Sequence, residues 1–222
     1  TSFLFQMHNT EHRQRLIMTQ DSPRPLASET SILKTIESLT QRNINALVVG
    51  STDEALRLLV TLVPSGSEVY CGTSETLDSI GFPEYIHNNP DYRSLDREFQ
   101  SESEPQNKLE LRRLSSTSEY YIGSVQAISE TGEVVVASSS GSQIGAYAFG
   151  AKHVILVAGT QKICPSLSDA ISRVRGYSTD KHDEWLAEKG IGPTPIGKLL
   201  ILEQESQIGR ITVLLVKDDL GW

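Results

Sequence analysis

Small polar residues that follow the apolar runs of this sequence are its first candidates for chemistry. The loop SSSGSQIG, within residues 129–150, places Ser139, Ser140 and Gly141 in one short stretch. The main-chain N–H groups of such a loop can form a concave nest that binds an anion. The loop lacks the lysine of a Walker loop and the G-x-G-x-x-G pattern of dinucleotide binding. It therefore either holds a small anion or merely joins a strand to a helix.

Glycines followed by a hydroxyl residue or a lysine mark three further candidates, one of which is Gly72-Thr73-Ser74, just before the predicted helix at residues 75–80. Gly50 and Ser51 stand before a helical pattern, whose first-turn N–H groups are free to bind an anion. Ser51 also has Glu54 three residues later, which is typical of an ordinary helix cap. Gly159 ends an apolar run and Lys162 follows it. This lysine either supplies a positive charge to a carboxylate or phosphate, or is a surface side chain.

Glu130 is the candidate catalytic residue. It opens the turn ETG, in which Gly132 suits the positive φ of a hairpin. A carboxylate that faces a ligand can act as a general base or a nucleophile, whereas one beside a turn is ordinarily solvated. Both interpretations of Glu130 stay open at this point.

The histidines and cysteines predict no metal site and no cofactor. His8 and His12 lie four residues apart without a clear third ligand, and His182 is expected to face solvent. Cys71 and Cys164 are too few for a zinc site or an iron–sulfur cluster. Both are expected to be structural thiols.

Composition and charge exclude several classes of partner. The 222 residues are 38% hydrophobic and 22% charged, with a formal net charge of −8. An acidic chain does not favour nucleic acid, because binding phosphates needs a clustered basic face. The sequence has no apolar run long enough for a membrane span. Two cysteines fit a reducing compartment, and the start lacks the pattern of a secretory signal, so we expect a cytoplasmic protein.

Helical spacing and short apolar runs alternate along the chain, as in an α/β fold with parallel strands. Residues 1–29 are expected to be a mobile N-terminal tail, and residues 30–222 a single α/β domain. Helices are predicted over residues 30–42, 51–63, 75–80 and 165–176, and Gly176 is predicted to end the last of them. Strands are predicted over residues 44–50, 67–71, 153–160 and 209–219.

Two regions depart from this alternation. The β-rich runs at residues 120–129 and 133–138 flank the ETG turn and predict an antiparallel hairpin. Residues 84–108 are polar and acidic without a clear period, and we expect a long loop or a partly helical insertion there.

Several longer stretches resemble the LUD domain, a lactate-utilisation family. The matching pieces are AISETGEVVV, GAYAFGAKHVILVAGTQKI followed by Pro165, and RITVLLVKDDLGW; ALVVGSTDEAL and VYCGTSETLDSIG also fit. The resemblance covers most of residues 30–222. It implies a fold of the sugar-isomerase/CoA-transferase type, which is a three-layer Rossmann-like, mainly parallel sheet with an antiparallel hairpin.

The same resemblance implies a function. Members of the family take part in oxidising L-lactate to pyruvate, usually with separate iron–sulfur subunits. It singles out Glu130, Thr131, Gly132, the Ser140–Gly141 loop and Lys162. Some relatives carry extra cysteines near the C-terminus, but residues 189–210 have none, which implies a form without a cluster. We therefore expect a non-redox accessory subunit that binds a small carboxylate or phosphorylated ligand at the strand carboxyl ends.

Two alternatives remain. The chain is a stand-alone isomerase or an acyl- or CoA-transferase-like enzyme that uses Glu130, or it is a binding or scaffold module without chemistry. A homo-oligomer is also expected, because the exposed helices of α/β domains often pair. An extended strand of about ten residues between Glu130 and Ser140 would span roughly 20–30 Å. The serine loop is thus the better anion candidate, unless a neighbouring subunit brings Glu130 to a shared site.

Overall fold

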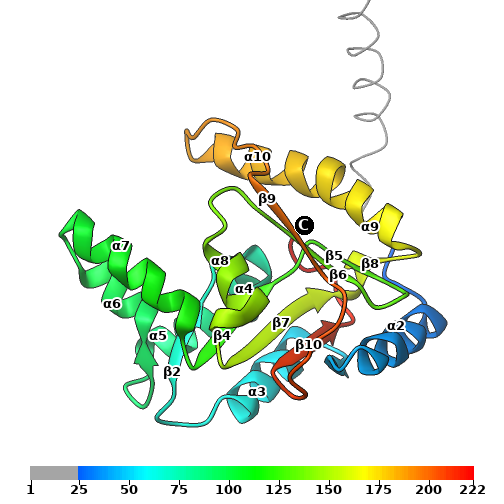
Figure 1. Ribbon diagram of the computed structural model, residues 1–222, viewed down its shortest axis with the longest axis horizontal. Coiled ribbons are helices and arrows are strands. Elements are labelled where there is room, and N and C mark those ends of the chain that lie inside the picture. Colours follow the sequence, from blue (N-terminus) through cyan, green and yellow to red (C-terminus); the bar gives the residue numbers. More distant parts are fainter. Residues whose placement is uncertain (1–24) are drawn as a thin grey trace, which may run out of the picture.

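A computed structural model describes residues 25–222, in which a six-stranded sheet packs against a smaller four-stranded sheet (Figure 1). The predicted tail over residues 1–29 lies outside the described residues up to residue 24, and Glu29 already begins a helix. The strands are β1 (Asn45–Val49), β2 (Glu68–Cys71), β3 (Arg93–Ser94), β4 (Tyr120–Ser124), β5 (Ala127–Ser129), β6 (Val134–Ser138), β7 (His153–Gly159), β8 (Ile163–Cys164), β9 (Lys198–Leu202) and β10 (Ile211–Val216). The α-helices are α2 (Glu29–Gln41), α3 (Thr52–Leu62), α4 (Glu75–Ile80), α5 (Phe82–Asn88), α6 (Leu95–Ser101), α7 (Pro105–Leu114), α8 (Ser142–Gly145), α9 (Leu167–Arg173) and α10 (Thr179–Glu188), and two π-helical segments are η2 (Ala146–Gly150) and η4 (Val174–Ser178).

The larger sheet is parallel throughout and confirms the predicted α/β class. Its strand order is β1-β10-β7-β4-β2-β3. Successive residues of the central strand β7 face opposite sides: Val154 and Leu156 pack toward α2 and the smaller sheet, whereas Ile155 packs toward α3, α4 and α5. Both faces are covered, so the strand is a nearly continuous apolar run, as expected for a buried parallel strand.

The smaller sheet contains the predicted hairpin. Its order is β8-β5-β6-β9, and β5 pairs antiparallel with β6, with Ile128 opposite Val134. One correction concerns residues 120–129, which we predicted as one strand. The chain leaves the larger sheet after Ser124 and re-enters sheet structure at Ala127, because β4 pairs in parallel with β7 while β5 pairs with β6.

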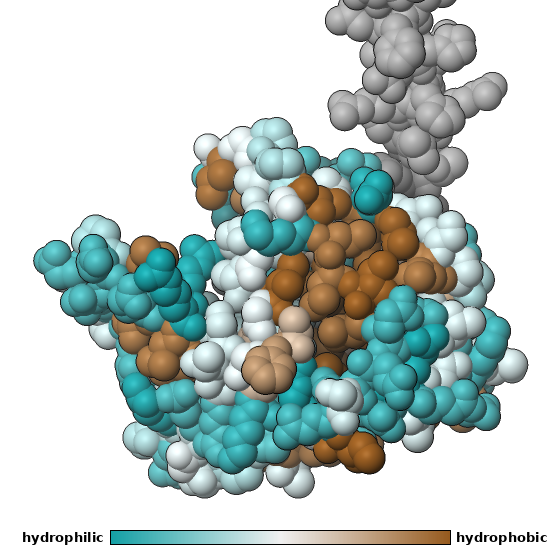
Figure 2. All heavy atoms as spheres, viewed as in Figure 1, coloured by the Kyte–Doolittle hydropathy of each residue, from teal (hydrophilic) through white to brown (hydrophobic). Residues whose placement is uncertain are grey.

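Strand β9 was not predicted and forms the edge of the smaller sheet. It pairs antiparallel with β6, with Leu200 opposite Val136. Leu199 and Ile201 are only half-buried on the side of α9. Hydrophobic surface gathers over β9 and α9 (Figure 2). The smaller sheet is therefore less completely covered than the larger one.

The helical predictions hold in part. Ser166 caps α9 and accepts a hydrogen bond from the Asp169 N–H, as its spacing predicts. Gly176 does not end this helix: η4 continues from α9 into α10, and Gly176 lacks the positive φ of a helix-terminating glycine. The polar region at residues 84–108 is mostly helical, since it contributes to α5, α6 and α7.

Gly132 holds the β5–β6 turn against α2 and should not tolerate alanine. Its φ is +95°, and a Cβ there would lie 2.8 Å from Arg42 Cδ and 2.8 Å from the backbone carbon of Ser38. Left-handed strain costs about 1–2 kcal/mol, and the clash with α2 adds to it. We expect Gly132→Ala to lower the free energy of unfolding in urea by about 2–4 kcal/mol.

The matched control for this variant is Gly66→Ala. Gly66 has a similar φ of +90°, but a Cβ at this position would have no other atom within 4 Å. It should show the cost of strain alone, about 1–2 kcal/mol. An equal decrease in the free energy of unfolding in the two variants would contradict the close approach of α2 to the turn.

Candidate functional site

A cavity of about 280 Å³ opens at the carboxyl ends of the parallel strands. From β2 the chain proceeds outward to β3, whereas from β4 it proceeds the other way to β7 and β10. The direction of winding therefore reverses between β2 and β4, which is where α/β sheets bind ligands. Ser74, just after β2, donates a hydrogen bond of 2.7 Å to Ser124 at the end of β4, and both serines line the cavity.

Lys162 forms part of the cavity lining and is almost completely buried, with 1% of its surface exposed. Its Nζ donates a hydrogen bond of 2.9 Å to Thr76 Oγ1. Burial, followed by the nearby positive charge of Arg173, lowers the pKa of Lys162 to about 7, although Asp219 acts in the opposite direction. The lysine thus sits between its charged and neutral forms near neutral pH.

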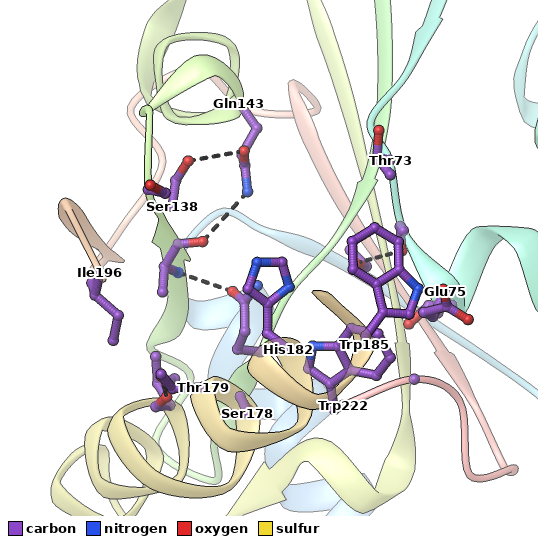
Figure 3. A pocket seen from close by; sticks show the side chains of 18 of the residues that line it. Thr73, Glu75, Ser138, Gln143, Ser178, Thr179, His182, Trp185, Ile196 and Trp222 are labelled. Atoms are coloured by element: carbon purple, nitrogen blue, oxygen red, sulfur yellow. Dashed lines mark hydrogen bonds between the residues drawn. The ribbon is translucent and has the colours of Figure 1, made fainter. Parts of the chain in front are cut away.

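One wall of the cavity is a fixed polar surface from β6 and α8 (Figure 3). Ser138 donates to Gln143 Oε1 at 3.1 Å, and Gln143 Nε2 donates to the Ala137 carbonyl at 3.4 Å. Gln126 Oε1 accepts the Ala137 N–H at 2.9 Å. These bonds fix the two amide groups beside the cavity, where they can contact a ligand without first becoming ordered.

The wall formed by α10 and the C-terminal segment is aromatic. His182 stacks on Trp185 with ring centroids 5.7 Å apart, and Trp222 lies 6.2 Å from Trp185 and 6.3 Å from His182. All three rings line the cavity and are half-buried (Figure 3). The prediction that His182 faces solvent is therefore wrong, since α10 directs this side chain to the cavity.

Lys162 and Ser139 are predicted site residues that line this cavity, and Thr73 and Ser74 of the predicted Gly72-Thr73-Ser74 segment line it as well. Ser139 follows β6 and is exposed at the cavity edge. The neighbouring residues Ser140 and Gly141 are not part of the lining. Gly141 has a φ of +86° and its N–H bonds to Ser138 Oγ at 2.9 Å, while Ser140 Oγ accepts from the Ser142 N–H at 3.3 Å. The polar groups of this loop are largely used within the loop itself.

Gly50, Ser51 and Gly159 lie at strand ends but outside the cavity lining. Ser51 caps α3, and Glu54 Oε2 accepts the Gly50 N–H at 2.7 Å, so a carboxylate of the chain already occupies this helix start. Gly159 is fully packed: a Cβ there would lie 2.4 Å from the Asp218 carbonyl oxygen. The absence of a side chain at Gly159 lets Gln161 and the segment after β10 pack against it, so it does not face a ligand.

Glu130, Thr131 and Gly132 lie together at the β5–β6 turn, where they contact α2 and not the cavity. Ser31 donates to Glu130 Oε1 at 2.5 Å and Lys34 to Oε2 at 2.9 Å. These two hydrogen bonds lower the pKa of Glu130 below its usual range. The Thr131 carbonyl accepts from Arg42 Nε at 2.7 Å. The contacts of this turn join the smaller sheet to α2.

Sequence reasoning missed the aromatic wall and part of the polar one. Gln126 and Thr76 stand at positions with no motif to mark them, whereas Ser138 and Gln143 belong to the loop SSSGSQIG that the sequence analysis singled out. The rarity of tryptophan was a usable signal, because the sequence contains two and a tryptophan outside a core is often functional. The structure places both of them, Trp185 and Trp222, in the lining of one cavity. In residues 25–222 no group of three or more His, Cys, Asp or Glu side chains is placed to hold a metal ion. No helix in that part of the chain is long and apolar enough to cross a membrane.

Comparisons with known proteins agree with this architecture. A family model described as LUD domain matches residues 32–216. A DUF162 family protein from Deinococcus radiodurans has a similar solved structure, with 11% sequence identity, coverage of 86% of this chain and 99% of that chain, and a TM-score of 0.52. That likeness shows the fold. A second solved structure, eIF2B beta from Chaetomium thermophilum, is 17% identical over 52% of this chain and 43% of that chain, and its TM-score of 0.35 is too low to indicate a shared fold. No curated protein matches this sequence.

Proposed function

The chain belongs to the LUD domain family, and on that premise we propose that its cavity at the strand ends binds a small carboxylate or phosphorylated ligand. We place the protein in the oxidation of a 2-hydroxy acid such as L-lactate, as a subunit that holds the ligand. The observation that carries the proposal is Lys162, a buried lysine in the lining of a cavity at the point where the sheet reverses its winding.

The electrostatic argument starts from the cost of burying Lys162. A buried ammonium group is unfavourable without a sufficient counter-charge, and here the positive Arg173 adds to that cost while Asp219 offsets only part of it. An anion in the cavity would supply the counter-charge and stabilise the protonated lysine. Glu75 also lines the cavity and disfavours further negative charge near α4. A ligand with one compact anionic group near Lys162 suits this arrangement best.

The electrons of such an oxidation would pass to a partner in this proposal. The 222 residues contain two cysteines, and both Cys71 and Cys164 are buried. Burial raises the pKa of Cys71 well above its ordinary value, and Asp96 adds to the effect, so this thiol is not prepared to ionise. Two buried cysteines cannot provide the four thiolates of an iron–sulfur cluster. The resemblance to the LUD family implies separate iron–sulfur subunits as electron acceptors, and we propose these as partners, in a cytoplasmic setting.

The test of ligand binding is a thermal-shift panel on the full chain at constant ionic strength. The panel contains L-lactate, pyruvate, ribose 5-phosphate and inorganic phosphate, with chloride as the control anion. A ligand at about 100 times its Kd stabilises a protein by about 2.7 kcal/mol, which shifts the Tm of a domain of this size by several degrees. We expect at least one of the acids to give that shift. No shift with any of them would contradict the proposed anion site.

The subunit role is tested separately. Native mass spectrometry of the freshly purified protein should show an added mass from a retained acid or a co-purifying iron–sulfur subunit. A chain that binds an acid and oxidises it alone, with a soluble electron acceptor and no partner, would contradict the accessory role while leaving the binding site intact.

Glu130→Gln distinguishes this proposal from a stand-alone enzyme that uses Glu130. Glu130 contacts Ser31 and Lys34 rather than the cavity, so we expect unchanged ligand-induced shifts in Tm. The partly exposed ion pair with Lys34 is worth less than about 1 kcal/mol, and the basal stability should fall by no more than that. Loss of ligand binding or of turnover in this variant, with the fold retained, would favour the Glu130 enzyme instead.

A further inference from the structure

The two tryptophans of the chain lie in one wall of the cavity, although their segments are far apart in sequence. Trp185 comes from α10, whereas Trp222 comes from the segment after β10. With His182 they form a group of three neighbouring rings. Figure 3 shows these rings on one side of the cavity and Gln143 and Ser138 across from them. The cavity thus has one aromatic wall and one polar wall.

The rings are not part of the hydrophobic core. The three core clusters contain neither tryptophan, and both indoles are half-buried. The Lys189 ammonium lies 3.5 Å from the centroid of Trp185, so a cation covers one face of that indole and holds it in place. Large aromatic surface that lines a hollow and is fixed but still accessible is typical of a ligand contact.

We propose that the ligand of this cavity carries a planar aromatic or heteroaromatic ring in addition to its acidic group, and that Trp185, Trp222 and His182 bind the ring. The acidic group is the one that the proposed function assigns to Lys162, so this inference rests on that function. Val174 and Ile196 add apolar surface to the lining. The amides of Gln126 and Gln143 lie beside the cavity and can donate to polar atoms of the ligand.

The volume sets the size of such a ligand. At about 280 Å³ the cavity lies at the lower end of the range for small-molecule sites. It suits an acid with one ring or one fused ring system better than a long cofactor. A ring-free acid such as lactate would fill the end near Lys162 and leave the aromatic wall uncovered.

The test compares pairs of acids that differ by the ring. The carboxylate pair is L-lactate and 3-phenyllactate; the phosphate pair is ribose 5-phosphate and adenosine monophosphate. Binding to the full chain is followed by intrinsic tryptophan fluorescence, which reports on this wall alone because both tryptophans lie in it, and by calorimetry. We expect the ring-bearing member of at least one pair to bind at least about tenfold more tightly.

Trp185→Leu separates ring recognition from general packing. It keeps an apolar side chain on α10, and Trp222 still reports binding. The preference for the ring-bearing acid should fall to about threefold or less, while the affinity for the ring-free acid stays within about twofold. The control is Glu188→Gln, an exposed change on the same helix that should alter neither affinity.

The outcomes distinguish this inference from the function on which it rests. Equal affinities within both pairs, or an equal loss for both members in Trp185→Leu, would overturn ring recognition and leave the anion site standing. Absence of binding by all four acids would overturn both. A ring preference that Trp185→Leu removes would support both.

Discussion

Replacing Lys162 with methionine is expected to make the unliganded protein more stable while weakening anion binding at least about 30-fold. Lys162 is almost completely buried, and its pKa is lowered to about 7 because burial and Arg173 disfavour the charged form. Methionine fills a similar volume without a charge. We expect Lys162→Met to raise the free energy of unfolding by roughly 1–4 kcal/mol near pH 7, less the loss of the hydrogen bond to Thr76.

The pH dependence of stability follows from the same shift. In the unfolded chain the lysine binds a proton up to about pH 10.4, whereas in the folded protein it releases that proton near pH 7. Between these values the unfolded state binds more protons, so Lys162 makes stability rise with pH. Below pH 7 both states are protonated, and the full cost of the buried charge is present. The stabilising effect of Lys162→Met should therefore be largest below pH 7 and disappear toward pH 10.

Ligand affinity should change with pH in the opposite direction. An anion binds the protonated lysine, whose fraction in the free protein falls about tenfold per pH unit above its pKa of about 7. The best-binding carboxylate of the thermal-shift panel should thus bind with constant affinity below pH 7 and progressively more weakly above it. In Lys162→Met we expect affinity to fall at least about 30-fold, and the progressive weakening above pH 7 to disappear.

The control for Lys162→Met is Lys152→Met. Lys152 is an exposed lysine paired with Glu119, so this variant removes the same formal charge from the surface. It should change neither affinity nor stability by much, since exposed ion pairs contribute little. Calorimetric titrations of both variants across pH test the prediction. Affinity in Lys162→Met within about threefold of the parent would mean that another group binds the anion.

Sequence patterns were sufficient wherever the determining contacts are local. The alternating faces of β7, the cap at Ser51 and the positive φ of Gly132 all depend on residues a few positions apart, and the structure has each of them. The sequence also placed Lys162 near the carboxyl end of a strand, because this lysine follows the apolar run that ends at Gly159. These features arise from backbone sterics and hydrogen bonding within one or two elements.

The rest depended on contacts between distant segments. Strand β9 is recognisable only through its pairing with β6, and the bend after Ser124 only through the two sheets that it connects. The aromatic wall needs α10 and Trp222 to meet, which no local pattern encodes. The prediction that Gly176 ends the helix was wrong, because this glycine does not adopt the positive φ that is typical of a helix end. The helical segment η4 continues through it instead. Tertiary contacts override local propensity at these points.

A second large effect is expected at Arg210, a buried arginine that connects the β9–β10 loop to the segment around η2. Its Nε pairs with Glu205 Oε2 at 2.8 Å, and the side chains of the two residues are 4% and 9% exposed. Its Nη1 donates to the carbonyls of Ala146 at 3.3 Å and Ala151 at 3.1 Å, and Nη2 donates to the Tyr147 carbonyl. Arg210 thereby satisfies carbonyls of η2, directly after the helix that carries Gln143 of the cavity wall.

Glu205→Ala should lower the free energy of unfolding by about 3–5 kcal/mol, because it leaves the Arg210 charge buried without its partner. Arg210→Met should cost a similar amount, since Glu205 and three carbonyls lose their donor. Removing both charges in Glu205→Ala/Arg210→Met should cost clearly less than the sum of the two single variants. Urea unfolding of the four proteins measures this coupling. The control, Glu110→Ala, breaks the exposed pair with Arg113 and should cost less than about 0.5 kcal/mol.

The pair also predicts how the protein responds to acid. Burial alone would raise the pKa of Glu205, but the hydrogen bond from the Gln207 N–H and the contacts with Arg210 outweigh it and hold the pKa below its usual range. A carboxylate with a lowered pKa contributes its full stability above its unfolded pKa of about 4.3 and loses it as pH falls through the folded value. The parent protein should therefore lose stability below about pH 4, and the double variant should lose less.

Additive single effects and identical acid sensitivity would show that Arg210 and Glu205 act independently. A strong coupling would instead identify this pair as one unit of the β9–β10 loop, from which Arg210 also donates to carbonyls of η2.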